Sequence, residues 1–80
     1  NESGYGRYDL AMIPIKSNEK AYLMEFKISK TEKGVTLKAE EALKQIDEKK
    51  YDMRLKARGI KNILKIGIAF YGKKVKVFSK

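Results

Sequence analysis

The chain has 80 residues with neither cysteine nor histidine, and its 19 lysines and arginines outweigh 10 acidic residues to give a net charge of +9. A chain of this length forms one small domain that buries only about 60% of the surface of its unfolded form, so we expect a thin margin of stability. The composition excludes disulfides, thiolate metal sites and catalytic triads built on imidazole, and it leaves carboxylates as ligands for a hard ion such as Mg²⁺ or Mn²⁺.

The excess of positive charge favours a polyanionic partner, and nucleic acid ranks ahead of an anionic membrane surface. The first residues do not resemble a signal peptide. The longest nearly apolar stretch, residues 63–71, contains Lys65 and is too short to span a bilayer. We therefore expect a cytoplasmic protein without membrane contact. Because the sequence begins at Asn1 rather than at Met, we interpret residues 1–80 as a single domain taken from a longer chain.

The first part of the chain is predicted to form an antiparallel hairpin. Residues 7–15 are mostly apolar and prone to extended structure, with interruptions at Asp9 and Pro14, and residues 21–28 form a second strand rich in large apolar side chains. The polar residues 16–19 make the turn. A connection this short cannot form a crossover, so the two strands must run antiparallel.

Helical structure is predicted next, because apolar residues recur with helical spacing at Val35, Ala39, Ala42, Leu43 and Ile46. Residues 51–58 form a second, short helical piece that ends at Gly59. Residues 62–70 form a third strand that is nearly all apolar, which is typical of a strand covered on both faces. Residues 75–78 form the last strand. The predicted fold is α/β, a small mixed sheet with flanking helix, and the helices can return the third strand parallel to one strand of the hairpin.

Three charged residues, Asp9, Glu25 and Lys27, interrupt the apolar strands of the hairpin. Side chains alternate across a strand, so Glu25 and Lys27 share one face, and Arg7 and Asp9 share one face of the first strand. With a three-residue turn, Ala11 pairs with Glu25 and Asp9 pairs with Lys27, which gathers the charges at one end of one face. A connection of even length would send Asp9 to the opposite face, so the prediction requires an odd length.

Such a cluster suits the hydrolysis of phosphodiester bonds. Asp9 and Glu25 could hold a divalent ion that lowers the pKa of a bound water and neutralises charge on the phosphate. Lys27 could orient that water, and Arg7 could contact phosphate oxygens. The same charges could instead form an ordinary cross-strand ion pair. A Glu-x-Lys pattern also recurs at residues 48–50, where we interpret it as the solvent-exposed face of a helix.

Several segments of the chain match the motifs of a known family. They are GRYDL at residues 6–10, YLMEFK at 22–27, EEALKQI at 40–46, KY at 50–51 and KIGIAF at 65–70. The first two resemble motif strands of the PD-(D/E)XK nuclease superfamily. The other three resemble its subfamily found at the C-terminus of AAA-ATPase-like proteins. The resemblance covers most of the chain and implies a truncated restriction-endonuclease-like core with flanking helices.

The resemblance also implies roles for particular residues. It makes Asp9 and Glu25 metal ligands for Mg²⁺ or Mn²⁺ and Lys27 the catalytic lysine. Gln45 matches a helix glutamine that many relatives place near the site, although a surface position is a common alternative. Nucleic acid is the implied substrate, with DNA favoured over RNA, and an ATPase-like domain is implied upstream in the full-length protein.

The chain departs from the family pattern at its start. The family core opens with a helix and a strand before the aspartate strand, and this sequence has no room for them. We expect the apolar sheet face left open to be covered by an upstream domain or by a second copy of the chain. Three functions stay open: an active metal-dependent nuclease, an inactive or incomplete nuclease fold that binds nucleic acid or a protein, and a structural domain whose charge serves solubility.

Overall fold

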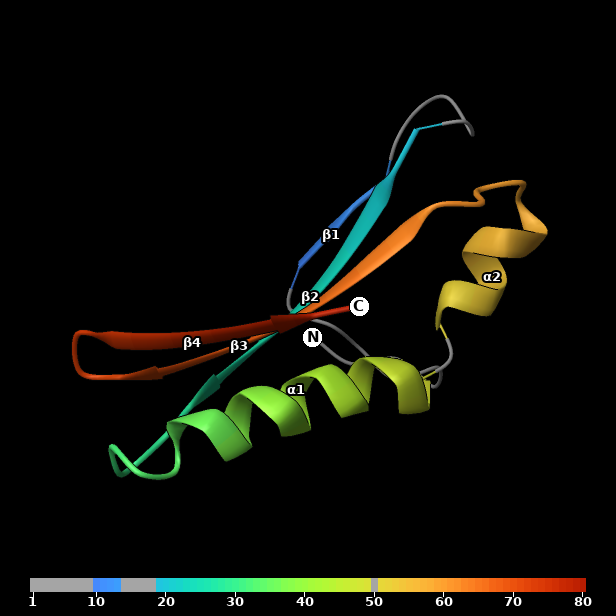
Figure 1. Cartoon of the computed structure of the whole chain (residues 1–80). Helices are drawn as coiled ribbons and strands as arrows, with labels where there is room; N and C mark the ends of the chain where they lie inside the picture. Colours follow the sequence, from blue (N-terminus) through green and yellow to red (C-terminus); the bar gives the residue numbers. More distant parts are fainter. Residues whose placement is uncertain (1–9, 14–18, 50) are drawn as a thin grey trace.

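The computed structural model describes residues 10–13, 19–49 and 51–80, and it has the predicted succession of elements (Figure 1). The elements are β1 (Leu10–Met12), β2 (Ala21–Ile28), α1 (Val35–Lys49), α2 (Tyr51–Ala57), β3 (Ile63–Tyr71) and β4 (Lys74–Ser79). This order confirms the predicted α/β fold. Within the described ranges, no helix is long and apolar enough to cross a membrane.

The four strands form one mixed sheet in the order β1-β2-β3-β4. β1 runs antiparallel to β2, β2 runs parallel to β3, and β3 runs antiparallel to β4. Parallel neighbours need a long crossover between them, and α1 and α2 supply it. The predicted hairpin and the predicted parallel return of the third strand are both confirmed.

The register between β1 and β2 differs from the predicted one. Ala11 pairs with Leu23 rather than with Glu25, a shift of two positions along β2. The described pairing ends at Met12 and Tyr22, and residues 14–18, which include part of the predicted turn, lie outside the described residues. Because the shift is even, the described side chains of β1 stay on their predicted faces. The number of residues between Met12 and its partner Tyr22 is odd, as predicted. Asp9 lies outside the described residues.

The helices α1 and α2 cover one face of the sheet (Figure 1). This face carries the odd-numbered side chains of β2 and β3, because side chains alternate across each strand. The core consists of the buried side chains of Ala21, Leu23, Ile46, Leu55 and Ile60, contributed by β2, both helices and the segment before β3. One small core on one face is therefore what holds the described elements together.

α1 lies directly on the backbone of β3 at Gly67. A Cβ atom at this position would lie 2.5 Å from the carbonyl oxygen of Ala39 and 2.5 Å from the backbone nitrogen of Leu43. Only glycine leaves room for so close an approach of two backbones. Gly67 pairs with Glu25 in β2, so this contact sets the height of α1 above Glu25.

The C-terminal end of α2 is closed by Gly59, as predicted. Gly59 has a φ of 94°, and its N–H donates to the carbonyl of Lys56 at 2.9 Å. The N–H of Ile60 donates to the carbonyl of Leu55 at 3.1 Å. These two bonds make a Schellman motif, in which glycine adopts the left-handed conformation without a steric penalty. Leu55 and Ile60 both belong to the core, so the turn ties α2 to the sheet.

The other face of the sheet is apolar and open over the described residues. Its exposed side chains include Met12, Phe26, Ile28, Val75 and Val77. The β3 side chains at positions 64, 66, 68 and 70 are only half-buried on this face. The prediction that this strand is covered on both faces is therefore wrong for the described residues. The physical reason is that α1 and α2 both pack on the opposite face.

We predict that Gly67→Ala lowers the free energy of unfolding by about 1–3 kcal/mol, the usual cost of overpacking a closely packed site. The added methyl group meets backbone atoms of α1 rather than a flexible side chain, so α1 must move away from the sheet. Urea unfolding followed by far-ultraviolet circular dichroism measures the change.

Gly72→Ala is the matched control. Gly72 has a φ of 55°, and nothing lies within 4 Å of a Cβ added there. This substitution therefore carries only the conformational penalty of a left-handed residue, roughly 1 kcal/mol. A loss for Gly67→Ala no greater than that for Gly72→Ala would contradict the close-approach argument.

Candidate active site

A carboxylate and a lysine lie on the same face of β2, beneath α1. Glu25 and Lys27 flank Phe26, so alternation sends both side chains to the covered face. Glu25 is only 7% exposed, and a carboxylate at such a depth is costly unless it is paired or hydrogen-bonded. The β3 residues paired with them, Gly67 and Ala69, have almost no side chain. Polar side chains of α1 can therefore reach down to this part of the sheet.

Gln45 of α1 connects Glu25 to Lys27. In the amide orientation that suits both neighbours, its nitrogen donates to Oε2 of Glu25 at 2.5 Å. In the same orientation its oxygen accepts a hydrogen bond from Nζ of Lys27 at 3.1 Å. Three of the predicted site residues, drawn from a strand and a helix, thus form one hydrogen-bonded chain.

Lys49, the last residue of α1, also contacts Glu25. Its Nζ lies 2.7 Å from Oε1 of Glu25, and the side chains of Lys49 and Glu25 are 19% and 10% exposed. The prediction that residues 48–50 form a solvent-exposed helix face is wrong for Lys49, whose side chain is largely buried against Glu25. The available signal was spacing, because residues four apart lie on the same face of a helix and Lys49 follows Gln45 by four.

Each oxygen of the Glu25 carboxylate therefore has its own donor, the Lys49 ammonium at Oε1 and the Gln45 amide at Oε2. Charge-assisted hydrogen bonds of this kind fix the orientation of a carboxylate. The Gln45 oxygen holds the Lys27 ammonium close to the same carboxylate. The arrangement can present an oriented carboxylate and an oriented ammonium to an anionic substrate.

Two other predicted site residues, Arg7 and Asp9, lie outside the described residues. Within the ranges that the structure does describe, no three acidic, histidine or cysteine side chains gather in a way that could hold a metal ion. Glu25 offers one oxygen ligand at this site, and a divalent ion there would need a further donor.

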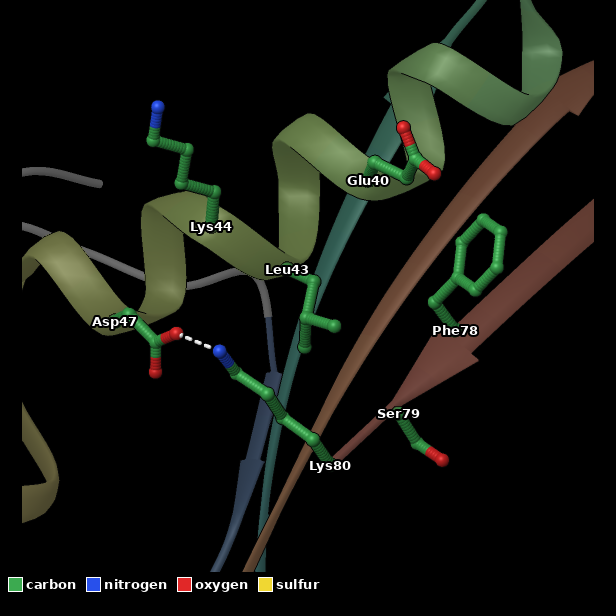
Figure 2. A pocket seen from close by; sticks show the side chains of 7 residues that line it. All are labelled: Glu40, Leu43, Lys44, Asp47, Phe78, Ser79 and Lys80. Atoms are coloured by element: carbon green, nitrogen blue, oxygen red, sulfur yellow. Dashed lines mark ion pairs between the residues drawn. The ribbon is translucent and has the colours of Figure 1, made fainter.

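A second cluster of charges joins α1 and α2 to the end of the sheet. Nζ of Lys65 in β3 lies 2.6 Å from Oδ1 of Asp47 and 3.3 Å from Oδ2 of Asp52. Lys80 also pairs with Asp47 (Figure 2). Hydrogen bonds from Lys65 and Lys80 lower the pKa of Asp47. Burial acts to lower the pKa of Lys65, but its hydrogen bonds to the two aspartates outweigh burial and raise that pKa.

Two pockets adjoin this second cluster. The first has a volume of about 320 Å³, lies between α1 and β4, and is lined by Glu40, Leu43, Lys44, Asp47, Phe78, Ser79 and Lys80 (Figure 2). The second has a volume of about 310 Å³ and shares Asp47 and Lys80 with the first. Neither pocket is lined by Glu25, Lys27 or Gln45. These two pockets therefore adjoin the second cluster and not the contacts of Glu25 with Gln45 and Lys49.

We predict that Asp47→Asn destabilises the protein at neutral pH and flattens the acid side of its stability profile. The pKa of Asp47 is lower in the folded chain than in the unfolded chain. Its contribution to stability is therefore present above the unfolded value, near 3.8, and disappears as the pH falls through the lower folded value. Urea unfolding between pH 7 and pH 2 should show the wild type and the variant converging as the pH falls.

Glu40→Gln serves as the control, because Glu40 is an exposed carboxylate on the same helix and lines the same pocket (Figure 2). This substitution removes one negative charge without breaking the contacts of Asp47. A stability difference between Asp47→Asn and the wild type that does not change with pH would contradict the prediction.

Comparison with known proteins places the chain in a family. The family model of the PD-(D/E)XK nuclease superfamily matches residues 1–80. Neither a curated protein nor a solved structure matches the chain. The match is to the superfamily, so the finer assignment to the AAA-ATPase-associated subfamily stays a prediction. The mixed four-stranded sheet with α1 across one face is consistent with the match. The chain therefore belongs to the PD-(D/E)XK nuclease superfamily and is a nuclease-type domain.

Proposed function

We propose that this domain is a metal-dependent nuclease that hydrolyses phosphodiester bonds in DNA. The observation that carries the proposal is the hydrogen-bonded chain from Glu25 through Gln45 to Lys27. A buried carboxylate and a lysine held side by side are the groups needed to bind a cation and to stabilise charge on a phosphate. The match to a nuclease superfamily supports the same chemistry.

The residues of the site suit a hard divalent ion such as Mg²⁺ or Mn²⁺. Carboxylate oxygens are the ligands that these ions prefer, and Oε1 of Glu25 already accommodates a positive charge, the ammonium of Lys49. We propose Glu25 and Asp9 as the ligands, since Asp9 directly precedes β1, the neighbour of β2. The ion would supply a water of lowered pKa and neutralise charge on the phosphate.

The remaining residues act on the substrate and on one another. Lys27 orients the attacking water or stabilises the negative charge that develops on the phosphate. Gln45 holds both Lys27 and Glu25, so it fixes their separation and their orientation before the substrate arrives. Arg7 contributes a phosphate contact, a role for which a guanidinium is well suited.

The charge of the chain supports nucleic acid as the ligand. A net charge of +9 on 80 residues attracts a polyanion from any direction. Binding that depends on phosphate contacts must weaken as salt rises, because counterions are released from the nucleic acid. DNA is proposed ahead of RNA by analogy with the superfamily.

A second candidate function is an inactive domain of the same fold that binds nucleic acid or a protein. The observation that favours it is the pairing of Glu25 with Lys49, because an ammonium already neutralises the carboxylate. Among the described residues, no further acidic side chain completes a metal site. Cleavage and binding of DNA, measured on the same proteins, distinguish the two functions.

We also propose a partner for the apolar face of the sheet. An upstream ATPase-like domain or a second copy of the chain would cover the apolar face that carries Phe26, Val75 and Val77. If a second copy covers this face, sedimentation velocity should detect a dimer whose population rises with protein concentration.

We predict that the wild type cleaves plasmid or single-stranded DNA in the presence of Mg²⁺ or Mn²⁺ and not in the presence of EDTA. Lys27→Ala and Glu25→Gln should each lower kcat/KM by roughly 100-fold or more, the usual loss when a group that stabilises developing charge is removed. Lys38→Ala is the control for loss of one positive charge, because Lys38 also lies on α1, its side chain is 43% exposed and it pairs with Glu41.

Electrophoretic mobility shifts on the same proteins complete the test. If the wild type and the variants all bind DNA but none cleaves it, the binding-module function replaces the nuclease. If the wild type neither cuts nor binds at low salt, both nucleic-acid functions are wrong. An equal loss of activity in Lys38→Ala would show that the effect of Lys27→Ala reflects net charge alone.

A further inference from the structure

We infer that Lys49 occupies the cation position of Glu25 and competes there with the divalent ion. The inference rests on the proposed function, because it concerns how the same carboxylate takes its metal. Neither the family match nor the sequence motifs assign a role to Lys49.

The contact between Glu25 and Lys49 is buried. The Glu25 side chain is 10% exposed and the Lys49 side chain is 19% exposed, so their 2.7 Å contact lies mostly out of water. A carboxylate at this depth needs a compensating positive charge or hydrogen bonds. Among the described residues, the Lys49 ammonium supplies a positive charge in direct contact with Glu25.

The two oxygens of the Glu25 carboxylate have different donors. Gln45 contacts Oε2 and is itself held by Lys27, whereas Lys49 contacts Oε1. Lys49 is also the final residue of α1, and its ammonium ends a flexible four-carbon stem. Lys49 can therefore leave Glu25 while Gln45 keeps the carboxylate oriented.

The Lys49 ammonium and a divalent ion cannot both bind Oε1 of Glu25. The ammonium at Oε1 and a divalent ion bound through the same oxygen would repel each other at short range. Binding of the ion to Glu25 must therefore release Lys49, and by reciprocity the presence of Lys49 must weaken the binding of the ion. Once released, the ammonium remains near the carboxylate and is available to a phosphate group.

The test compares Lys49→Met with Lys44→Met by isothermal titration with Mn²⁺. Methionine keeps an unbranched side chain, one heavy atom shorter than that of lysine, and removes its charge. Lys44 lies on the same helix, is exposed, and extends away from the sheet (Figure 2). We expect Lys49→Met to bind Mn²⁺ about tenfold more tightly than the wild type, a typical coupling between linked sites, and Lys44→Met to bind like the wild type.

Thermal unfolding provides a readout that is independent of ion affinity. In EDTA, Lys49→Met should have a lower Tm than the wild type, because Glu25 keeps its hydrogen bond with Gln45 but has lost the ammonium that compensates for its charge. Mn²⁺ should raise the Tm of Lys49→Met by more than it raises that of the wild type. If Lys49→Met does not fold in EDTA, Lys49→Arg replaces it. Because a guanidinium pairs more strongly with a carboxylate than an ammonium does, Lys49→Arg should bind Mn²⁺ more weakly than the wild type.

Glu25→Gln distinguishes failure of this inference from failure of the proposed function. If Glu25→Gln abolishes Mn²⁺ binding but Lys49→Met binds no more tightly than the wild type, Lys49 does not compete and the inference is wrong, while the metal site stands. The inference is equally wrong if Lys49→Arg binds Mn²⁺ as tightly as the wild type or more tightly. If the wild type and Lys49→Met both fail to bind Mn²⁺, the proposed metal site and the inference fail together.

Discussion

The contact between α1 and β3 at Gly67 is the constraint on which the site depends. The absence of a Cβ lets the backbone of α1 rest on the strand, and Gly67 is the direct partner of Glu25 in β2. A helix held at this height can reach Glu25 with the short side chain of Gln45. If α1 stood farther from the sheet, Glu25 would lose the hydrogen bonds from Gln45 and Lys49 that compensate for its burial.

Three polar side chains of α1 make contacts with two different strands. Gln45 and Lys49 contact Glu25 in β2, whereas Asp47, which lies between them in the sequence, pairs with Lys65 in β3. A helix places residues two apart on different sides, so one turn of α1 can serve both. The pairs made by Asp47 fix the end of α1 that carries Lys49. The stabilising cluster and the candidate site are thus coupled through one rigid turn.

Much of the fold could be predicted from the sequence, because the type and the buried face of each element depend on the local spacing of apolar residues. Alternation along residues 21–28 was enough to place Glu25 and Lys27 on one face, and the left-handed turn at Gly59 followed from residue chemistry alone. The register of β1 was wrong by two positions, because alternation determines the face of each side chain but not its partner on the neighbouring strand. Lys49 was missed for a different reason: a lysine at the end of an amphipathic helix looks the same in sequence whether it meets water or a buried carboxylate.

The contact between Lys49 and Glu25 links stability to function. A domain of 80 residues has a small core, here confined to one face of the sheet, so an unpaired buried carboxylate would consume much of its stability. The Lys49 ammonium removes that cost, but it does so by covering the oxygen that a metal ion would use. A buried, neutralised Glu25 is therefore compatible with both an active and an inactive domain. What separates them is whether a divalent ion, with a second carboxylate and the phosphate of a substrate, binds Glu25 more strongly than the lysine does.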